Sequence, residues 1–348
     1  MFAPPPLARS IEASFRDATS SKPAVRASAL GDLGKHAGRS DVVRARALAV
    51  LERALQDERA EVRAAAAVAL ADIGAHEALP SLLLAMEDPD AYVRQMAIQA
   101  LGEIGDARAW PRLRRALSDE RPEMRYQAVM AVAKFSHMRG ERGHSTPPPP
   151  AEDNDLAEAL SVALGDDDPQ VRYIALRVAD APADGPPLHH AALIDQAREL
   201  LTDPAVTVRV AAAIYLAGAS EAAACPVLLG VVEGTLTTEE LEDERAAVEL
   251  VGVMGLTSAV TALERRVWGV KRYVRDTCEW HARIALARLG HIRAQNEIVR
   301  DLGSLRETTR QAAVVAAGRA RLVSCRAAVV RANVDQALVD EALGLLDE

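Results

Sequence analysis

Aromatic side chains are scarce in this sequence, where they make up 3% of 348 residues. A compact core usually draws much of its buried area from aromatic rings, and the chain is about twice the length of an ordinary domain. Apolar residues nevertheless reach 49%, and Ala, Leu and Val supply most of them. Because small side chains let helices pack closely and alanine has the best helix propensity, this composition favours many short helices.

The sequence also lacks a disulfide framework, a membrane span and a secretory signal. Its three cysteines, Cys225, Cys278 and Cys325, lie far apart, which favours a reducing compartment. No apolar run approaches the roughly 18 residues that cross a bilayer, and the N-terminus has no basic start followed by an apolar stretch. We therefore expect a cytoplasmic protein without membrane insertion.

Positive charge is in deficit, since the formal net charge is −9 at pH 7. Such a chain repels nucleic acid and anionic membranes, so nucleic acid is a disfavoured partner. The sequence has no P-loop, no dinucleotide-binding glycine motif, no G-x-S-x-G and no H-E-x-x-H. We therefore expect a protein that is not an enzyme and carries no cofactor.

What the sequence does have is an internal repeat. Three segments align without a gap at a spacing of 31 residues: 57–74, 88–105 and 119–136. The same frame occurs once before these segments, at 20–34. It continues after them in five further regions: 166–182, 203–220, 239–255, 272–290 and 304–320. Repeats of this period are typical of solenoids, whose helical hairpins bury their apolar faces only by stacking.

Each unit follows one physical plan. An Asp such as Asp57 opens the second helix, where its carboxylate can accept from free backbone N–H groups. Apolar residues then recur at helical spacing, as Val62, Ala66 and Ile73 do. Gly74 ends this helix, and a shorter first helix, for example over 78–87, precedes each second helix.

The pattern of an Asp, five residues and an Arg, with Ile-Gly at the end, resembles HEAT repeats of the bacterial, phycobilisome-lyase-like type. The resemblance implies an all-α fold, a right-handed α-solenoid (α-α superhelix) of about nine helical hairpins. It also implies a structural ladder of charges between neighbouring repeats, formed by Asp57, Arg63, Asp88, Arg94, Asp119, Arg125, Asp166, Arg172, Asp203 and Arg209. Glu239 with Arg245 is a conservative variant of the pair, whereas Ser20 and Ser304 replace the Asp in the outermost copies.

The frame breaks once, between Arg125 and Arg172, where the spacing exceeds the period. The added residues include four consecutive prolines, which favour an extended polyproline II segment. We expect a single solenoid over 1–348 in three parts: N-terminal repeats (1–137), a Pro-rich loop or linker (138–155) and C-terminal repeats (156–348).

One stripe of the second helices is a candidate partner-binding surface. Positions one, five and nine residues after each ladder Arg share a helical face, which we expect on the concave side. In consecutive repeats this stripe holds Tyr126 and Tyr173, flanked by Met130, Lys134 and Arg177. Such side chains are typical interface anchors, although the two tyrosines would equally fill the irregular junction beneath the Pro-rich segment. Our leading hypothesis is a scaffold or adaptor that binds another protein here.

A second hypothesis is nucleic-acid binding through the segment 265–275. Its basic residues alternate with two aromatics, a pattern that binds phosphates and stacks on bases, and they are Arg265, Arg266, Lys271, Arg272 and Arg275. The same pattern equally suits a solvated helix face that complements acidic stretches of the chain.

A third hypothesis is a lyase or metal-dependent enzyme subunit, because some HEAT-like proteins are enzymes. Deoxyhypusine hydroxylases carry repeated His-Glu dyads as iron ligands, but this chain has one dyad, His76-Glu77. Phycobilin lyases need a tetrapyrrole groove, and HEAT-like DNA glycosylases need a basic one, which the acidic balance disfavours. Cys278 and His281 are potential metal ligands on adjacent turns, but zinc needs more, so we expect a packed cysteine and an exposed histidine.

Overall fold

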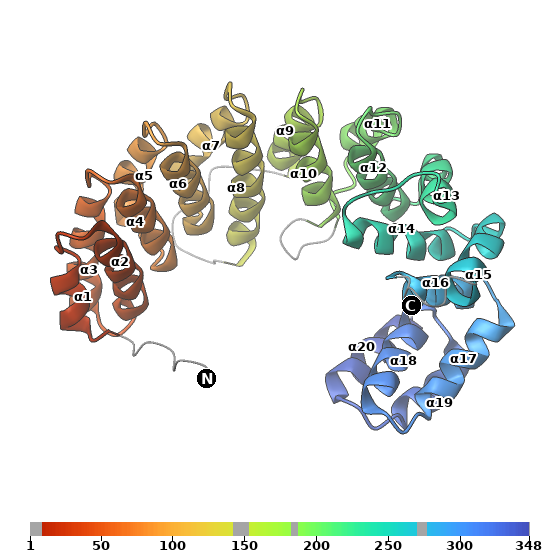
Figure 1. Ribbon diagram of the computed structural model, residues 1–348. Coiled ribbons are helices and arrows are strands. Elements are labelled where there is room, and N and C mark those ends of the chain that lie inside the picture. The colour runs from red at the N-terminus through yellow and green to blue at the C-terminus, as the bar shows by residue number, and fades with distance from the viewer. Residues whose placement is uncertain (1–8, 142–152, 182–186, 270–276, 348) are drawn as a thin grey trace. The chain divides into compact units, whose positions relative to one another are not determined.

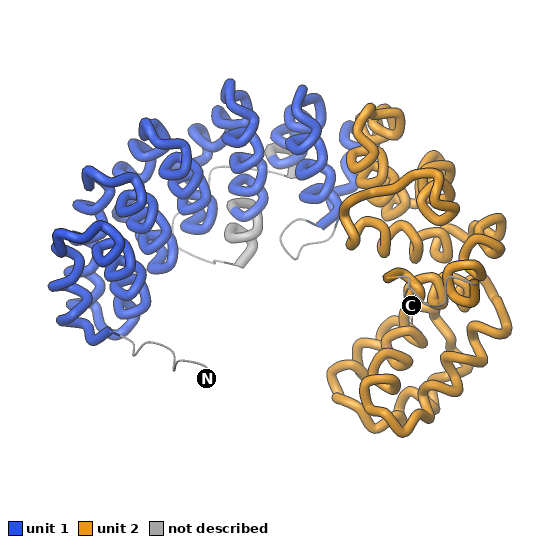
Figure 2. Tube along the Cα trace, viewed as in Figure 1, with its two compact units in different colours: residues 1–193 blue, residues 194–348 orange. Residues whose placement is uncertain are grey.

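The computed structural model describes residues 9–141, 153–181, 187–269 and 277–347. Within these ranges the chain forms twenty α-helices, several short 3-10 turns and no strand, which confirms the all-α prediction. The chain divides into two compact units, residues 1–193 (unit 1) and 194–348 (unit 2), which Figure 2 distinguishes by colour.

Unit 1 consists of helical hairpins in which each odd-numbered helix is the first and each even-numbered helix the second (Figure 1). Its helices are α1 (Ile11–Asp17), α2 (Pro23–Ala37), α3 (Asp41–Ala54), α4 (Ala60–Asp72), α5 (Leu79–Ala85), α6 (Ala91–Ile104), α7 (Trp110–Ala116), α8 (Pro122–Glu141), α9 (Asp153–Leu164) and α10 (Pro169–Asp180).

Unit 2 continues the alternation, and its first helix begins just before the division. Its helices are α11 (Ala191–Leu200), α12 (Val206–Gly218), α13 (Cys225–Glu233), α14 (Leu241–Val253), α15 (Val260–Trp268), α16 (Glu279–Arg288), α17 (Ile292–Leu302), α18 (Glu307–Arg319), α19 (Arg326–Val330) and α20 (Gln336–Asp347). The described helices thus pair into ten hairpins. The sequence predicted about nine because the short pair α19–α20 lacks the Asp/Arg pattern.

Second helices of successive hairpins pack side by side within each unit and form one layer, which we call the inner layer; the first helices form the other (Figure 1). The core between the layers is built from small apolar side chains, and Leu70, Leu101 and Val132 are all completely buried. The helices α6 and α8 approach closely, since a Cβ added to Gly102 would lie 2.7 Å from the Cα of Ala131. Only glycine fits there without a shift of the backbone.

Glycine also ends helices where the sequence predicted it. Gly74 follows α4 with φ of 58°, and Gly105 caps α6 with φ of 66°. Side chains with a Cβ rarely adopt this left-handed conformation. Each helix therefore stops at its glycine, and the chain turns into the next hairpin.

The helix α8 continues to Glu141 and α9 begins at Asp153, so both helices extend into the range 138–155. Residues 142–152 lie outside the described residues, so a division of the chain at 138–155 stays a prediction. The contacts divide the chain elsewhere, between Leu193 and Ile194. Among the described helices, none has both the length and the apolar character needed to cross a membrane.

Candidate partner-binding surface

A ladder of ion pairs joins neighbouring repeats of unit 1. Arg63 Nε and Nη2 donate to the two carboxylate oxygens of Asp88 at 2.7 and 2.8 Å. The remaining nitrogen, Nη1, donates to the backbone carbonyl of Asp57 in its own repeat at 2.8 Å. Arg63 thus links the loop that precedes its own helix to the loop of the next repeat, which explains its place six residues after Asp57.

The same arrangement occurs at two other junctions. Arg26 binds both carboxylate oxygens of Asp57, and Arg125 binds both of Asp166. Each carboxylate also accepts a hydrogen bond from the backbone N–H of the residue two positions later, as Asp57 does from Arg59 at 3.0 Å. Partial burial favours the neutral acids, but these hydrogen bonds outweigh it, so the pKa values of Asp57 and Asp166 lie below their ordinary value.

One junction of unit 1 departs from this pattern. Asp119 should accept from Arg94, but it is bound by Arg121 of its own repeat, with Nε and Nη2 both 2.7 Å from the carboxylate oxygens. Arg94 is buried and donates through Nη1 to the carbonyl groups of Asp88 and Pro89, while its Nε has no partner among the described residues. The predicted pair is therefore not formed, because a nearer arginine occupies the carboxylate.

In the later repeats the arginines keep their backbone contacts. Arg172 Nη1 donates to the carbonyl of Asp166 at 2.6 Å, and Arg209 Nη1 donates to that of Asp203. In the last ladder repeat, Arg310 Nη1 donates to the carbonyl of Ser304 at 2.9 Å. The backbone contact thus persists where Ser replaces the Asp.

The pair Glu239/Arg245 is corrected by the structure. Second helices such as α4 and α6 begin three residues after the ladder Asp, whereas α14 begins at Leu241, which places Thr238 at that position. Thr238 Oγ1 accepts from the Glu240 N–H at 3.2 Å, as a ladder Asp would. Arg245 instead forms an ion pair with Glu242 at 2.6 Å. The sequence frame was one residue out of register here.

The inner layer of unit 1 contains a small depression between α6 and α8. Its volume is about 190 Å³, and its lining consists of Gln99, Tyr126, Gln127, Met130, Ala131 and Lys134. Three of these residues, Tyr126, Met130 and Lys134, belong to the stripe that the sequence singled out. All three are half-buried, so their side chains form the walls of the depression and remain accessible.

An ion pair between α6 and α8 fixes the position of the charged side chain on one rim of the depression. Lys134 Nζ of α8 lies 2.6 Å from Glu103 Oε1 of α6, and Gln99 Nε2 donates to the same oxygen at 3.0 Å. Burial favours the neutral form of Glu103, but these two hydrogen bonds outweigh it and lower its pKa. The side-chain amide of Gln127 makes no hydrogen bond with any described residue, so it is available to a ligand.

The other two stripe residues lie on α10, and neither lines the depression. Tyr173 and Arg177 are half-buried, and Arg177 approaches Asp180 at 4.0 Å. Burial raises the pKa of Asp180. In the next repeat, Val210 and Ile214 hold the equivalent stripe positions and are buried. The stripe is thus an accessible surface in unit 1 but part of the core in α12.

The basic segment 265–275 is only partly described, since Lys271, Arg272 and Arg275 lie outside the described residues. Arg265 is exposed on α15. Arg266 is mostly buried and donates to the carbonyl groups of Val231 and Val232 and to Glu244 at 2.8 Å. The structure therefore uses Arg266 inside unit 2 rather than presenting it to a ligand.

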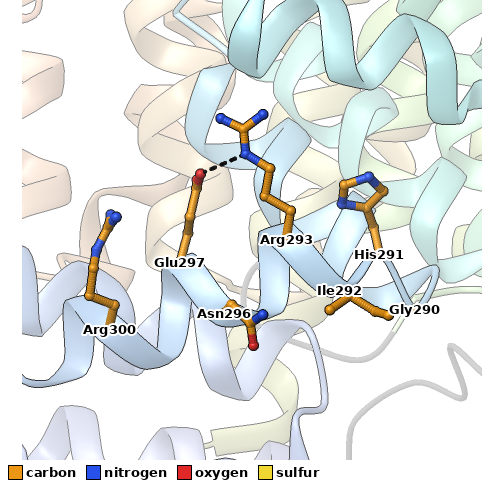
Figure 3. Close-up of a pocket in the computed structure, with 7 residues that line it drawn as sticks. All are labelled: Gly290, His291, Ile292, Arg293, Asn296, Glu297 and Arg300. Atoms are coloured by element: carbon orange, nitrogen blue, oxygen red, sulfur yellow. Dashed lines mark hydrogen bonds and ion pairs between the residues drawn. The ribbon is translucent and has the colours of Figure 1, made fainter.

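The first helix α17 carries a second, shallow depression, which sequence reasoning did not find (Figure 3). Its volume is about 750 Å³, and it is lined by Gly290, His291, Ile292, Arg293, Asn296, Glu297 and Arg300. Arg293 forms an ion pair with Glu297 at 3.2 Å and covers the ring of Trp268 at 4.1 Å. Because Trp268 is covered from α17 by Arg293, and His291 lies 5.2 Å from its ring, its stacking capacity is largely used within the protein.

The histidine and cysteine candidates have partners or are buried. His76 Nδ1 lies 3.3 Å from Asp106 Oδ2, and Cys278 is completely buried. His281 is less exposed than predicted, since it is half-buried with Nδ1 2.5 Å from Glu249 Oε1. Within the described ranges, no group of three or more His, Cys, Asp or Glu side chains is placed to hold a metal ion. All three cysteines are free thiols.

The sequence pattern of the HEAT-repeat family matches residues 15–88 and 80–143. These residues contain HEAT repeats. These HEAT repeats cover α1 to α8 of unit 1, which includes the depression between α6 and α8. A search of curated proteins found no match.

The solved structure of YibA shows the same kind of fold, and two further structures are similar to a lesser degree. YibA of E. coli has a TM-score of 0.55 and 16% identity to this chain, covering 81% of this chain and 93% of its own. An engineered protein has a TM-score of 0.44 and 20% identity, with 97% and 99% covered. The CpcE–CpcF complex of phycocyanin lyase from Nostoc sp. PCC7120 has a TM-score of 0.33 and 22% identity, with 83% and 93% covered. At these identities the likeness of YibA concerns the helical HEAT-type fold alone.

Proposed function

We propose that this HEAT-repeat protein is a non-catalytic scaffold that binds a segment of another protein on the inner layer of unit 1. The observation that carries the proposal is the depression between α6 and α8. It combines an aromatic ring and a thioether with two amides and an ammonium group in one accessible place. Tyr and Met supply contact area, and polar groups at the rim orient a ligand.

The charges of unit 1 support a structural rather than a chemical role for most ionisable side chains. Ladder residues such as Arg63 and Asp88 are engaged with each other and with backbone groups. The depression has room for about one large apolar side chain. A partner segment would place such a side chain between Tyr126 and Met130, with its polar groups beside Gln99 and Gln127.

Quantitative affinity capture with two variants tests this proposal. The double variant Tyr126→Ala with Met130→Ala removes the walls of the depression. Tyr92→Ala is the matched control, because Tyr92 is an exposed aromatic at the start of α6 outside the depression. We expect proteins captured by the wild type and by Tyr92→Ala to be depleted about tenfold or more with the double variant.

The same proteins must then bind the purified chain directly, as measured by calorimetry. Circular dichroism shows whether the double variant keeps its helical content. If a folded double variant captures the same proteins in the same amounts as the control, the depression is not the binding surface.

A further inference from the structure

Two glutamine side chains line the depression of unit 1 from different helices, Gln99 from α6 and Gln127 from α8, and both are half-buried. Gln99 Nε2 donates to Glu103 at 3.0 Å, so the Gln99 side-chain oxygen remains as an acceptor. The Gln127 side-chain amide makes no hydrogen bond with any described residue, and it offers two N–H donors and an oxygen acceptor. The depression therefore presents uncharged donors and acceptors beside the apolar surfaces of Tyr126 and Met130.

The depression has no excess charge that would select an ion. Among the residues that line it, Lys134 is the one charged side chain, and Glu103 Oε1 lies 2.6 Å from its ammonium nitrogen. An amide gains most from a ligand that both donates and accepts, because a polar group left unpaired when a ligand excludes water is destabilising. A peptide backbone is such a ligand, since each residue other than proline carries one N–H and one C=O.

The conformation of the bound segment follows from the same groups. In an α-helix the backbone N–H and C=O groups bond to each other, so a helix would leave both glutamines without backbone partners. A bound helix also gains affinity from several side chains along a groove, whereas this depression of about 190 Å³ has room for about one. An extended segment exposes its backbone groups and alternates its side chains. One side chain can therefore enter between Tyr126 and Met130 while the glutamines reach the backbone beside it.

We propose that the partner segment binds in an extended conformation and that Gln99 and Gln127 hydrogen-bond its backbone. This inference rests on the proposed function, because it describes the segment that the depression binds. Tyr126 and Met130 contact the inserted side chain, and the two amides fix the path of the chain on either side of it. Hydrogen bonds to a backbone depend little on sequence, so the partner sequence is constrained mainly at the inserted apolar residue.

Short random peptides displayed on phage test the inference, with the full chain as bait. Peptides that also bind the double variant Tyr126→Ala with Met130→Ala are removed, and the remaining sequences are synthesised for calorimetry. We expect these peptides to share one large apolar residue and to lack apolar residues repeated at helical spacing. If no peptide binds the wild type more tightly than the double variant, the depression does not bind a linear segment, and the inference and the proposed function both fail.

One substitution in the chain separates the inference from the proposed function. Gln127→Met keeps the length of the side chain but removes its amide, so it should weaken binding of the selected peptide by about fivefold to tenfold. Gln170→Met is the matched control, because Gln170 is an exposed glutamine in the first turn of α10 outside the depression. It should leave the affinity unchanged, and circular dichroism shows whether both variants keep their helical content.

A proline scan of the selected peptide reports its bound conformation. Proline breaks a helix, but it fits an extended chain wherever the replaced N–H is not hydrogen-bonded. We expect at least one position beyond the first turn of the peptide to accept proline with an affinity within about twofold of the parent. Equal affinities of wild type and Gln127→Met, or loss of binding with proline at every such position, would overturn the inference. The proposed function would stand in that case, since the peptide still distinguishes the wild type from the double variant.

Discussion

Arg121 Nε lies 2.7 Å from Asp119, in the place that Arg94 of the preceding repeat would take if the ladder were regular. Arg94 stays close enough for its charge to lower the pKa of Asp119, although the hydrogen bond from Arg121 is the main cause. The α6–α8 junction therefore has two arginines for one carboxylate, and it is also the junction that forms the depression.

This competition predicts an unusual result for Arg121→Ala. In the wild-type structure the buried Nε of Arg94 has no acceptor among the described residues. Without Arg121, the carboxylate of Asp119 becomes available to it. We expect the free energy of unfolding to change by less than about 0.5 kcal/mol. The comparison is Arg63→Ala, which leaves Asp88 mostly buried without its partner and should cost about 2 kcal/mol. Urea unfolding at neutral pH measures both, and equal losses would show that Arg94 does not replace Arg121.

Two glycine substitutions test the close packing of the inner layer. A Cβ at position 102 would lie 2.7 Å from the Cα and 2.9 Å from the Cβ of Ala131, so Gly102→Ala forces α6 and α8 apart. We expect a loss of about 1–3 kcal/mol. Gly31→Ala in α2 meets nothing within 4 Å, and it should stabilise the protein by up to about 1 kcal/mol because alanine is the better helix former. Thermal or urea unfolding would contradict this account if both variants shifted stability in the same direction.

Acid titration tests the loop before α7. The Arg108 side chain donates to the carboxylate of Asp106 and, despite partial burial of that carboxylate, lowers the pKa of Asp106 to about 2. Hydrogen bonds from the backbone N–H of Arg108 and from His76 lower it as well. Because this folded value lies below the unfolded value of about 3.9, Asp106 stabilises the fold fully above about pH 4. That contribution is lost as the pH falls through about 2.

We therefore expect wild type to be more stable than Asp106→Asn near neutral pH, with a difference that shrinks below about pH 4. Asn retains the side-chain oxygen that caps the turn, so the comparison isolates the charge. Urea unfolding at several pH values measures the difference, and a difference that is independent of pH would exclude this role for Asp106.

The ladder shows what the sequence could predict. In five repeats the second helix begins three residues after the Asp, and the Arg six residues after that Asp donates to its backbone carbonyl group, so the spacing marked the starts of α4, α6, α8, α10 and α12. The spacing did not reveal which arginine a given Asp binds, because Arg121 and Arg94 both reach Asp119 and their distances depend on side-chain conformation. In the repeat of α14, Glu239 and Arg245 imitate the spacing, and only the helix start at Leu241 shows the true register.

The sequence predicted only part of the residues that line the depression. Helical periodicity places Tyr126, Met130 and Lys134 on one face, and these three residues line the depression. Periodicity does not say how closely neighbouring helices approach, so it could not show that Gln127 completes the wall while Tyr173 does not line it. In unit 2, Arg288 Nη1 donates to the carbonyl oxygen of Arg319 in the next repeat, and no spacing in the sequence marks that contact.

Site-specific photo-crosslinking tests the central claim most directly. A photoreactive amino acid at position 127 would lie in the depression, and one at position 112 would lie on the exposed side of the first helix α7. Each full-length variant would be irradiated in its native cells and analysed by mass spectrometry. We predict that a defined partner segment is crosslinked at position 127 and not at position 112. Crosslinking of the same proteins with equal yield at both positions, or at position 112 alone, would contradict the account.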